Sequence, residues 1–564
     1  MAEGWKNQLW FGDNLEIMRN RVAFPDEFVD LIYLDPPFNS NATYNVLYEE
    51  KTGRKSEAQT IAFKDTWEWD DVADATYREL IATGPHQAPP KVRDLLQALY
   101  GFLGKESRPG RNAMMAYLVM MAARLVELHR VLKPNGSLYL HCDPTASHYM
   151  KLVLDAVLGA QNFRNELIWK RTSGHSDARR FGAVHDSVLF YSKTNDYSWN
   201  ETYQPYDDAY VKQYYRYKDE SGRRFMSGDL GAAGLQGGGY DYEWRGVRRV
   251  WRVPLKTMER LEAENRIYYT RNGIPRIKRY LDEAKGMPSQ DVLTDVEALR
   301  SWHKERLGYP TQKPELLLER IVTASSSEGD LVLDPFCGCG TTIAVAERLK
   351  RRWIGIDITY LAIDLIERRL HGHYTDRKPG KKGKEQEAKE GIDDLQPYEI
   401  QGAPFDLASA RSLAERDRFQ FQWWTLSKVG ARGGQKKGAD KGIDGEIVFE
   451  DPKGEFQRII VSVKSGKVGR ETISVLKGDV GREKAAIGVL VTLEKPTKPM
   501  RDEAREAGRY ESKLWPATYP QIQILTIQDI FDGKFIEYPR IADATFKQAK
   551  RQSKERRKQK DLKI

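Results

Sequence analysis

Runs of apolar residues separated by polar breaks predict alternating strands and helices in the first 375 residues. An unbroken apolar run at 29–34 stops at Asp35-Pro36-Pro37-Phe38, which predicts a buried strand that ends in a rigid loop. Apolar residues recur at helical spacing from Asn112 to Leu132, and a Lys-Pro-Asn-Gly break separates them from the extended segment 137–143. The pattern therefore predicts consecutive units of helix followed by strand.

A strand, a glycine-rich turn, a helix and a second strand are expected in order over residues 329–358. Gly338 and Gly340 precede the helix, where glycines let the backbone come close to a ligand at the helix N-terminus. Asp357 follows Gly340 by 17 residues and would end the second strand, where a carboxylate can accept both ribose hydroxyls. The segment predicts a nucleotide-type pocket. The glycine spacing departs from the dinucleotide fingerprint, which argues against a dehydrogenase.

Residues 193–300 are polar, aromatic and glycine-rich, which indicates an insertion into this α/β pattern. Aromatic rings and arginines in it would suit stacking on bases and contact with phosphates, although a half-buried β surface has a similar composition. The residues that carry this interpretation are Tyr214, Tyr215, Arg216, Trp244, Arg245, Arg248, Arg249 and Trp251.

A second domain is predicted after residues 376–392, which are rich in Lys, Gly and Glu and read as a linker. It would start with a helical stretch at 405–427 and continue as a hairpin turning near Pro452 and Lys453, followed by two further strands. In that hairpin Asp444 would lie opposite about Val461, close to Ser462 and Lys464 on one face.

Length and charge set the general class. The 564 residues suffice for three or four domains, and three cysteines are too few for a disulfide framework, so we expect a reducing, cytoplasmic setting. No signal peptide or membrane-spanning segment is apparent. The net charge of +9 is concentrated in a tail, where residues 547–563 hold nine basic and two acidic residues. That tail could bind a polyanion or simply solubilise the chain end.

The loop at residues 35–38 suggests its own chemistry. Two consecutive prolines fix the backbone and remove its donors, so the loop presents a carboxylate, carbonyl oxygens and an aromatic ring. Asp35 and the Pro36 carbonyl could accept hydrogens from an exocyclic amine, and Phe38 could stack on an extruded base. The simpler alternative is a Pro-Pro turn after a buried strand.

Taken together, these motifs resemble the β class of exocyclic-amine DNA methyltransferases, in which an Asp-Pro-Pro loop comes first, a target-recognition insert second and the cofactor loop last. The resemblance covers about residues 5 to 375. It extends to Gly12-Asp13-Asn14-Leu15, LKPNGSLYLHCD, LIWKRTSG, HDSVLFYSK and the segment from Tyr309 to Pro314. It implies an α/β, Rossmann-like fold that uses S-adenosylmethionine, carries a target-recognition insertion and acts on double-stranded DNA.

The resemblance also assigns roles to residues. Asp35, Pro36, Pro37 and Phe38 would act on the target amine, and an aspartate at the first position favours adenine N6, with cytosine N4 as the alternative. Methylation at a cytosine carbon is excluded because the chain has no Pro-Cys dipeptide, and Cys337 with Cys339 makes a poor zinc signature. The cofactor would contact Asp334, Phe336, Gly338, Gly340 and Thr341 at its methionine, Asp357 at its ribose, Asp13 near its adenine, and Gln312 and Lys313 near its carboxylate.

The second domain resembles the Mrr-like branch of the PD-(D/E)xK nucleases, a smaller α/β restriction-endonuclease-like fold. That resemblance implies that Asp444 holds Mg²⁺ and Lys464 activates water. Ser462 stands where the family's pattern has Glu, Asp or Gln, and Glu446 is a candidate for the missing carboxylate. Three alternatives stay open: an active endonuclease, a domain that binds DNA without cutting it, and a plain structural hairpin.

The expected organisation follows from both resemblances, and points to a restriction-modification or phage-defence enzyme working as a homodimer or with a partner subunit. The predicted segments are a catalytic part at 1–194, the target-recognition insertion at 195–305, the cofactor-loop part at 306–375, a flexible linker at 376–400, the endonuclease-like domain at 401–540 and a basic tail at 541–564.

Overall fold

The structure is a computed structural model in two compact units, residues 201–290 and the remainder of the chain. It describes residues 4–371 and 395–539, with gaps at 38–41, 50–54, 66–68, 85, 104–110, 175–178, 180, 233–238, 301–302, 304, 308, 310, 434–441, 452–454 and 514–515. Phe38, the basic tail and most of the predicted linker therefore lie outside the described residues.

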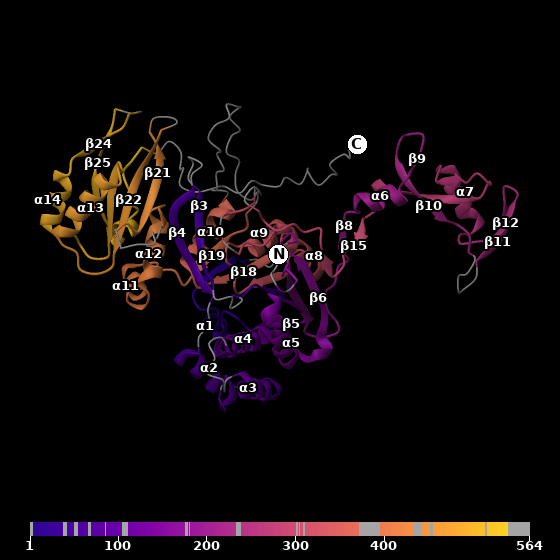
Figure 1. Ribbon diagram of the computed structural model, residues 1–564, viewed down its shortest axis with the longest axis horizontal. Coiled ribbons are helices and arrows are strands. Elements are labelled where there is room, and N and C mark those ends of the chain that lie inside the picture. Colours follow the sequence, from indigo (N-terminus) through magenta and orange to yellow (C-terminus); the bar gives the residue numbers. More distant parts are fainter. Residues whose placement is uncertain are drawn as a thin grey trace. The chain divides into compact units, whose positions relative to one another are not determined.

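A nine-stranded sheet organises the first part of the larger unit (Figure 1). Its described neighbours run parallel except at β7, which is antiparallel to both β5 and β6. In spatial order the strands are β16 (Val292–Leu293), β6 (Phe163–Lys170), β7 (His185–Ser192), β5 (Leu132–Cys142), β2 (Val29–Leu34), β17 (Leu331–Asp334), β18 (Arg352–Asp357), β1 (Asn7–Phe11) and β19 (Tyr398–Gln401).

Helices cover both faces of this sheet, which explains why β2 reads as a continuous apolar run. Leu31 and Tyr33 enter one core cluster and Ile32 and Leu34 the other, as alternation along a strand requires. The first cluster packs under α8 (Glu315–Ser325), α9 (Thr341–Arg348) and α10 (Tyr360–His371). The second packs under α1 (Asn14–Arg19), α2 (Asp71–Ile81), α3 (Pro90–Leu103), α4 (Arg111–Val131) and α5 (Pro144–Leu154).

Residues 201–290 form a small unit with its own core, inside the segment predicted as an insertion. Trp251 is fully buried and Tyr215 is 3% exposed, so neither can stack on a base as the sequence interpretation had it. Tyr214 and Arg216, in contrast, are exposed. The elements are β8 (Tyr203–Gln204) with β15 (Met287–Pro288), the sheet of β13 (Ile267–Tyr269), β14 (Pro275–Tyr280), β10 (Arg224–Asp229) and β9 (Tyr217–Lys218), the hairpin of β11 (Tyr240–Trp244) and β12 (Val247–Trp251), and helices α6 (Asp208–Tyr214), α7 (Leu255–Ala263) and η3 (Leu281–Glu283).

A second, five-stranded sheet lies in the C-terminal part of the larger unit. The helical stretch predicted at 405–427 is two helices, because Asp417 interrupts it and its side chain caps the second one. The strands in spatial order are β20 (Arg432–Gly433), β21 (Gly445–Glu450), β22 (Phe456–Lys464), β23 (Ile487–Thr492) and β26 (Ile522–Thr526), and the helices are α11 (Leu407–Arg416), α12 (Arg418–Lys428), α13 (Arg470–Arg482), α14 (Lys498–Glu506) and α15 (Ile527–Phe531).

The end of the predicted linker is not a linker. Residues 398–401 form β19, which pairs in parallel with β1 and so belongs to the nine-stranded sheet. Hydrogen bonding to an otherwise open sheet edge accounts for this order despite the polar sequence. None of the described helices is both long and apolar enough to cross a membrane. The remaining described elements are the hairpin of β3 (Ala42–Glu49) and β4 (Lys55–Asp65), the pair β24 (Arg509–Glu511) and β25 (Thr518–Pro520), the π-helix η1 (Asp155–Gly159) and the 3-10 helix η2 (Ala160–Asn162).

Candidate active site

Acidic residues end neighbouring parallel strands at one edge of the nine-stranded sheet. Asp334 and Asp357 are the last residues of β17 and β18, and Asp35 directly follows β2. Asp13 comes two residues after β1, whose last residue pairs with Asp357. In open parallel sheets ligands bind at this carboxyl edge. The strand order therefore gathers carboxylates that are far apart in the sequence.

The glycine-rich loop joins β17 to α9 in a shape that other residues do not readily adopt. Gly338 and Gly340 have φ angles of 50° and 72°, in the left-handed region. A Cβ at Gly340 would lie 2.6 Å from the Ile366 side chain, and one at Gly338 would lie 3.3 Å from the Tyr309 ring. Backbone conformation therefore favours glycine at both positions, and packing against Ile366 also requires it at Gly340, in addition to the approach to a ligand that the sequence predicts.

Asp357 anchors that loop. One of its oxygens accepts from the Gly338 amide at 2.9 Å, and the other accepts from the amide and hydroxyl of Thr359, each at 2.8 Å. Burial raises the pKa of Asp357 to about 6, although these hydrogen bonds lower it. Burial likewise raises the pKa of Asp334 to about 7, and repulsion from Asp35 and Asp357 adds to the effect. Carboxyl groups with raised pKa values are thus concentrated at this edge of the sheet.

These features fit S-adenosylmethionine. Its sulfonium and ammonium groups are cationic, and buried carboxylates with raised pKa values gain most from a cation placed among them. Asp13 lies beside the same loop, because its neighbour Asn14 donates to the Pro335 carbonyl at 2.6 Å. Arg124 donates to Asp13 at 2.8 Å and to Asn14 at 2.6 Å, which fixes both side chains.

The side chains of Gln312 and Thr341 form hydrogen bonds within the protein. The Gln312 amide accepts from Leu307 N at 2.7 Å and donates to Glu305 O at 2.6 Å, holding the segment before α8. The Thr341 hydroxyl donates to the Lys313 carbonyl at 3.3 Å. Phe336 packs against the second core cluster and donates its amide to Asp334 at 3.0 Å. Among these predicted cofactor contacts, the polar side chains of Gln312 and Thr341 therefore already form hydrogen bonds within the protein.

Asp35 pairs with Lys313, which the resemblance had assigned to the cofactor. The Lys313 ammonium donates to Asp35 Oδ2, and the two side chains are 9% and 14% exposed. Asp35 Oδ1 is buried without a hydrogen-bond partner in the described part of the chain. Pro36 is buried and Pro37 half-buried beside it, while Phe38 lies outside the described residues.

Sequence reasoning assigned no role to a polar chain beneath this loop. The Tyr33 hydroxyl lies 2.9 Å from His141 Nδ1, and His141 Nε2 lies 3.3 Å from Asp186 Oδ2. Arg171 approaches the other Asp186 oxygen at 3.1 Å. Burial alone would raise the pKa of Asp186, but the hydrogen bond and charge of His141, with Arg171 and Lys313, lower it. The signal was a histidine and an aspartate in strands that are otherwise apolar.

Arg369 was also missed. It is 7% exposed, and its guanidinium donates to the Cys339 carbonyl at 3.1 Å, to Thr341 at 3.2 Å and to Glu315 at 2.8 Å. A buried arginine within the apolar pattern of α10 was the available signal. It ties the glycine-rich loop to α8 and α10.

The nuclease-like residues do not assemble a metal site among the described residues. Gly445 pairs with Val461, one place away from the predicted register, so Asp444 lies beside Ser462. Asp444 Oδ2 accepts from Val463 N at 2.6 Å and from Ser462 Oγ at 3.4 Å. Glu446, the candidate second carboxylate, is paired with Arg432 and also lies 3.7 Å from Arg458. No group of three potential metal ligands occurs in the described ranges, so the structure offers no support for the Mg²⁺ site.

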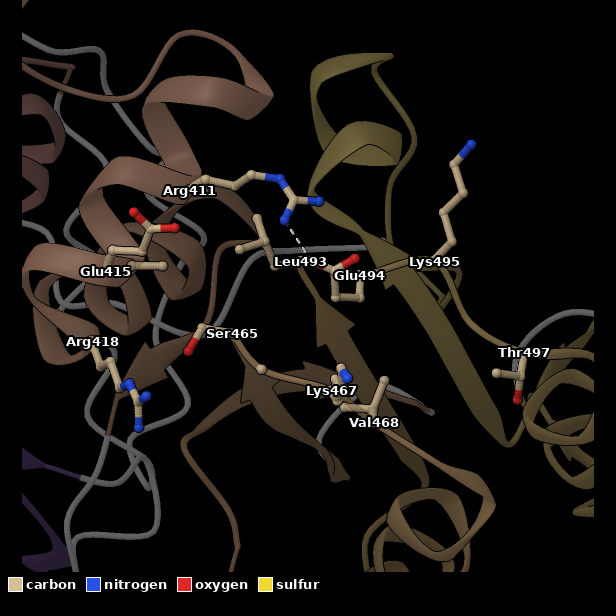
Figure 2. Close-up of a pocket in the computed structure, with 12 residues that line it drawn as sticks. Arg411, Glu415, Arg418, Ser465, Lys467, Val468, Leu493, Glu494, Lys495 and Thr497 are labelled. Atoms are coloured by element: carbon tan, nitrogen blue, oxygen red, sulfur yellow. Dashed lines mark hydrogen bonds and ion pairs between the residues drawn. The ribbon is translucent and has the colours of Figure 1, made fainter.

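A pocket of about 640 Å³ opens beside this centre, at the ends of β22 and β23 (Figure 2). Arg411 and Glu494 form an ion pair of 2.6 Å across it. The loop that follows Lys464 forms part of its wall. The lining residues are Arg411, Ala414, Glu415, Arg418, Ser465, Gly466, Lys467, Val468, Leu493, Glu494, Lys495 and Thr497.

Residues 29–368 match the sequence profile of a family described as DNA methylase, whose members modify adenine N6 or cytosine N4. The chain belongs to this DNA methylase family. The match includes Asp35, the unit 201–290 and the glycine-rich loop, whereas Asp13 and Arg369 lie outside it.

The chain is similar in sequence to restriction-modification enzymes. It is 33% identical over 264 residues to the type II methyltransferase M.EcaI of Enterobacter cloacae, covering 45% of this chain and 57% of the relative. It is 26% identical over 356 residues to the Mod subunit of the type III enzyme StyLTI of Salmonella typhimurium, covering 59% and 48%. The chain thus spans about half the length of these curated relatives.

Among solved structures, the chain is similar to a putative DNA modification methylase from Thermus thermophilus, complexed with S-adenosyl-L-methionine. The identity is 15% and the TM-score 0.30, with 64% of this chain and 92% of the other covered. Residues 420–531 match a different family, described as NACHT-associated inactive Restriction Endonuclease 1. This match agrees with the endonuclease-like region predicted from sequence, and the matched family is described as inactive.

Proposed function

We propose that this protein transfers a methyl group from S-adenosylmethionine to the exocyclic amine of adenine in duplex DNA. The observation that carries the proposal is the position of Asp35, which follows β2 directly beside the strand that leads into the glycine-rich loop. Membership of the DNA methylase family supports it. A carboxylate for the amine and a pocket for the cofactor thus lie at one sheet edge.

Residues of the site would have two tasks, which are to accept hydrogens from the target amine and to hold the cofactor. When bound, the cofactor supplies an electrophilic methyl group. Asp35 Oδ1 and the Pro36 carbonyl accept hydrogens from the amine, which localises its lone pair for attack. The methyl group would leave the cofactor's sulfonium as a neutral thioether forms, and the proton that the methylated amine must lose would pass to Asp35 Oδ1 and then to water. Asp334 would hold the cofactor's cationic methionine end, and Asp357 its ribose.

In the methyltransferase class that the chain resembles, an aspartate at the first position of the loop favours adenine N6 over cytosine N4, and residue 35 is an aspartate. The test is to incubate the protein with methyl-labelled S-adenosylmethionine and mixed-sequence duplex DNA, digest the DNA and identify the labelled nucleosides by mass spectrometry. The expected product is N6-methyldeoxyadenosine. Label in N4-methyldeoxycytidine would show that the target base is cytosine. Absence of label from both nucleosides would overturn the proposed function.

The unit at 201–290 is proposed to read the target sequence. Its exposed arginines Arg216, Arg248 and Arg249 can contact phosphates, and the predicted insertion boundaries of 195 and 305 enclose it. The names of relatives such as the StyLTI Mod subunit support a role in restriction-modification, alongside a partner subunit.

For the C-terminal region we propose DNA binding without cleavage. The proposal rests on the basic side chains of the pocket, where Arg418, Lys467 and Lys495 are exposed and have no ion pair within the described residues. Phosphates of a DNA backbone are the anions that such a group attracts. Replacing Arg418 and Lys467 by Ala should weaken binding of non-specific duplex and reduce its salt dependence, whereas Lys350→Met on the methylase surface should not. Unchanged binding and salt dependence would refute this role.

A further inference from the structure

The pair formed by Asp35 and Lys313 joins the two halves of the methylase region. The residues are 278 positions apart, and both side chains are largely buried. A lysine ammonium that donates to one oxygen of a carboxylate in such a place fixes the orientation of that carboxylate. The resemblance assigned Lys313 to the cofactor's carboxylate, so its contact with Asp35 calls for a different role.

The two oxygens of Asp35 differ. Lys313 occupies Oδ2, while Oδ1 is buried and has no hydrogen-bond partner among the described residues. A buried acceptor without a donor costs free energy, and it gains most from a ligand that brings one. An exocyclic amine brings N–H donors. The unsatisfied oxygen is therefore the one suited to the amine.

The backbone of Lys313 is hydrogen-bonded to a residue at the end of the glycine-rich loop. Its carbonyl accepts from the Thr341 hydroxyl at 3.3 Å, and that hydroxyl accepts from Arg369 at 3.2 Å. Arg369 in turn pairs with Glu315 at 2.8 Å. Lys313 precedes Pro314, the residue before α8, so its backbone is constrained by the loop and the helix together.

We propose that Lys313 is a positioning residue, which holds Asp35 Oδ2 so that Oδ1 faces the target amine. This role rests on the proposed methyl transfer. It goes beyond that proposal because Lys313 would act on the target amine through Asp35, and would not bind the cofactor. Removing the ammonium lets the Asp35 carboxylate rotate and leaves it without its counter-charge. Loss of Lys313 therefore impairs the transfer step and spares cofactor binding.

The test compares wild type, Lys313→Met, Lys313→Arg and the control Lys350→Met, whose lysine lies on the surface with a side chain 68% exposed. Cofactor affinity is measured by calorimetry, and kcat by label transfer to saturating DNA. We expect Lys313→Met to lower kcat at least about tenfold while cofactor Kd changes less than about threefold. Lys313→Arg should recover part of kcat, because a guanidinium can also hold one carboxylate oxygen. Lys350→Met should match wild type.

A thermal double-mutant cycle with Asp35→Asn checks the contact without any activity. The Tm loss caused by Lys313→Met should be larger with Asp35 present than with Asn, because only the first combination leaves a buried charge unpaired. Additive losses would overturn the pairing. If Lys313→Met raised the cofactor Kd and left kcat unchanged, Lys313 would be a cofactor-binding residue, and the positioning role would be overturned. Absence of transfer by wild type would instead overturn the proposed function on which this role rests.

Discussion

At the scale of single residues, the site is defined by carboxylates whose charges the protein does not fully compensate. Asp334 shows this most clearly, since it is 2% exposed and burial raises its pKa to about 7. In the unfolded chain the same group titrates near 3.8. The native state therefore binds a proton that the unfolded state has already lost between these two values.

The sign of the resulting pH dependence follows directly. Because the folded pKa is raised, Asp334 favours the unfolded state above pH 7, and this penalty disappears as the pH falls toward 3.8. A shift of this size corresponds to at most about 4 kcal/mol. Asp334→Asn keeps the shape and the acceptor for Phe336 but removes the charge. Without cofactor, the Tm of Asp334→Asn relative to wild type should be higher at pH 8 than at pH 5. A difference that does not depend on pH would contradict this.

Pairings between distant residues could not be read from the sequence. Asp35 and Lys313 were both singled out, yet nothing in a sequence pattern shows that an ammonium 278 positions away reaches that carboxylate. Likewise Trp251 resembled a base-stacking residue because composition cannot distinguish an aromatic core from an aromatic surface. Roles that depend on tertiary contacts required the structure.

At the scale of elements, hydrophobic patterning was sufficient where it was strong. The strand predicted at 29–34 is β2, the helix predicted at 112–132 is α4, and the strand–turn–helix–strand at 329–358 is β17, α9 and β18. Patterning failed where the signal was weak. The polar segment 398–401 is a strand because it pairs with β1, and the hairpin register differs by one residue because turn geometry, not apolar content, sets it.

The glycine-rich turn gives a prediction at this scale. Gly340 and Gly329 both have positive φ angles, 72° and 87°, but an added Cβ meets Ile366 at 2.6 Å in the first and nothing within 4 Å in the second. Gly329→Ala should therefore cost about 1 kcal/mol of unfolding free energy, from backbone strain alone. Gly340→Ala should cost clearly more and weaken cofactor binding, because α10 must move away from the loop. Denaturant unfolding and calorimetry of both variants provide the measurement, and equal losses would contradict the packing argument.

At the scale of the whole molecule, the chain joins a region of the DNA methylase family to a region whose sequence matches a family described as an inactive endonuclease. Asp444 accepts a hydrogen bond from the Val463 amide in β22, and Glu446 forms an ion pair with Arg432. Ser462 has no carboxylate to offer a metal ion. We predict that the protein leaves unmethylated and premethylated plasmid intact with Mg²⁺, and that Lys464→Ala behaves identically. Nicking that needs Mg²⁺ and disappears in Lys464→Ala would mean that the centre is active.

The central claim is that Asp35 acts on the target amine at a site whose cofactor pocket is built by other residues. The most direct measurement compares methyl transfer to duplex DNA and S-adenosylmethionine affinity in wild type and Asp35→Ala. We predict that transfer by the variant falls below a tenth of wild type, a barrier increase above about 1.4 kcal/mol, while calorimetry shows the cofactor still bound. Transfer retained above a tenth, with the cofactor bound, would contradict the account.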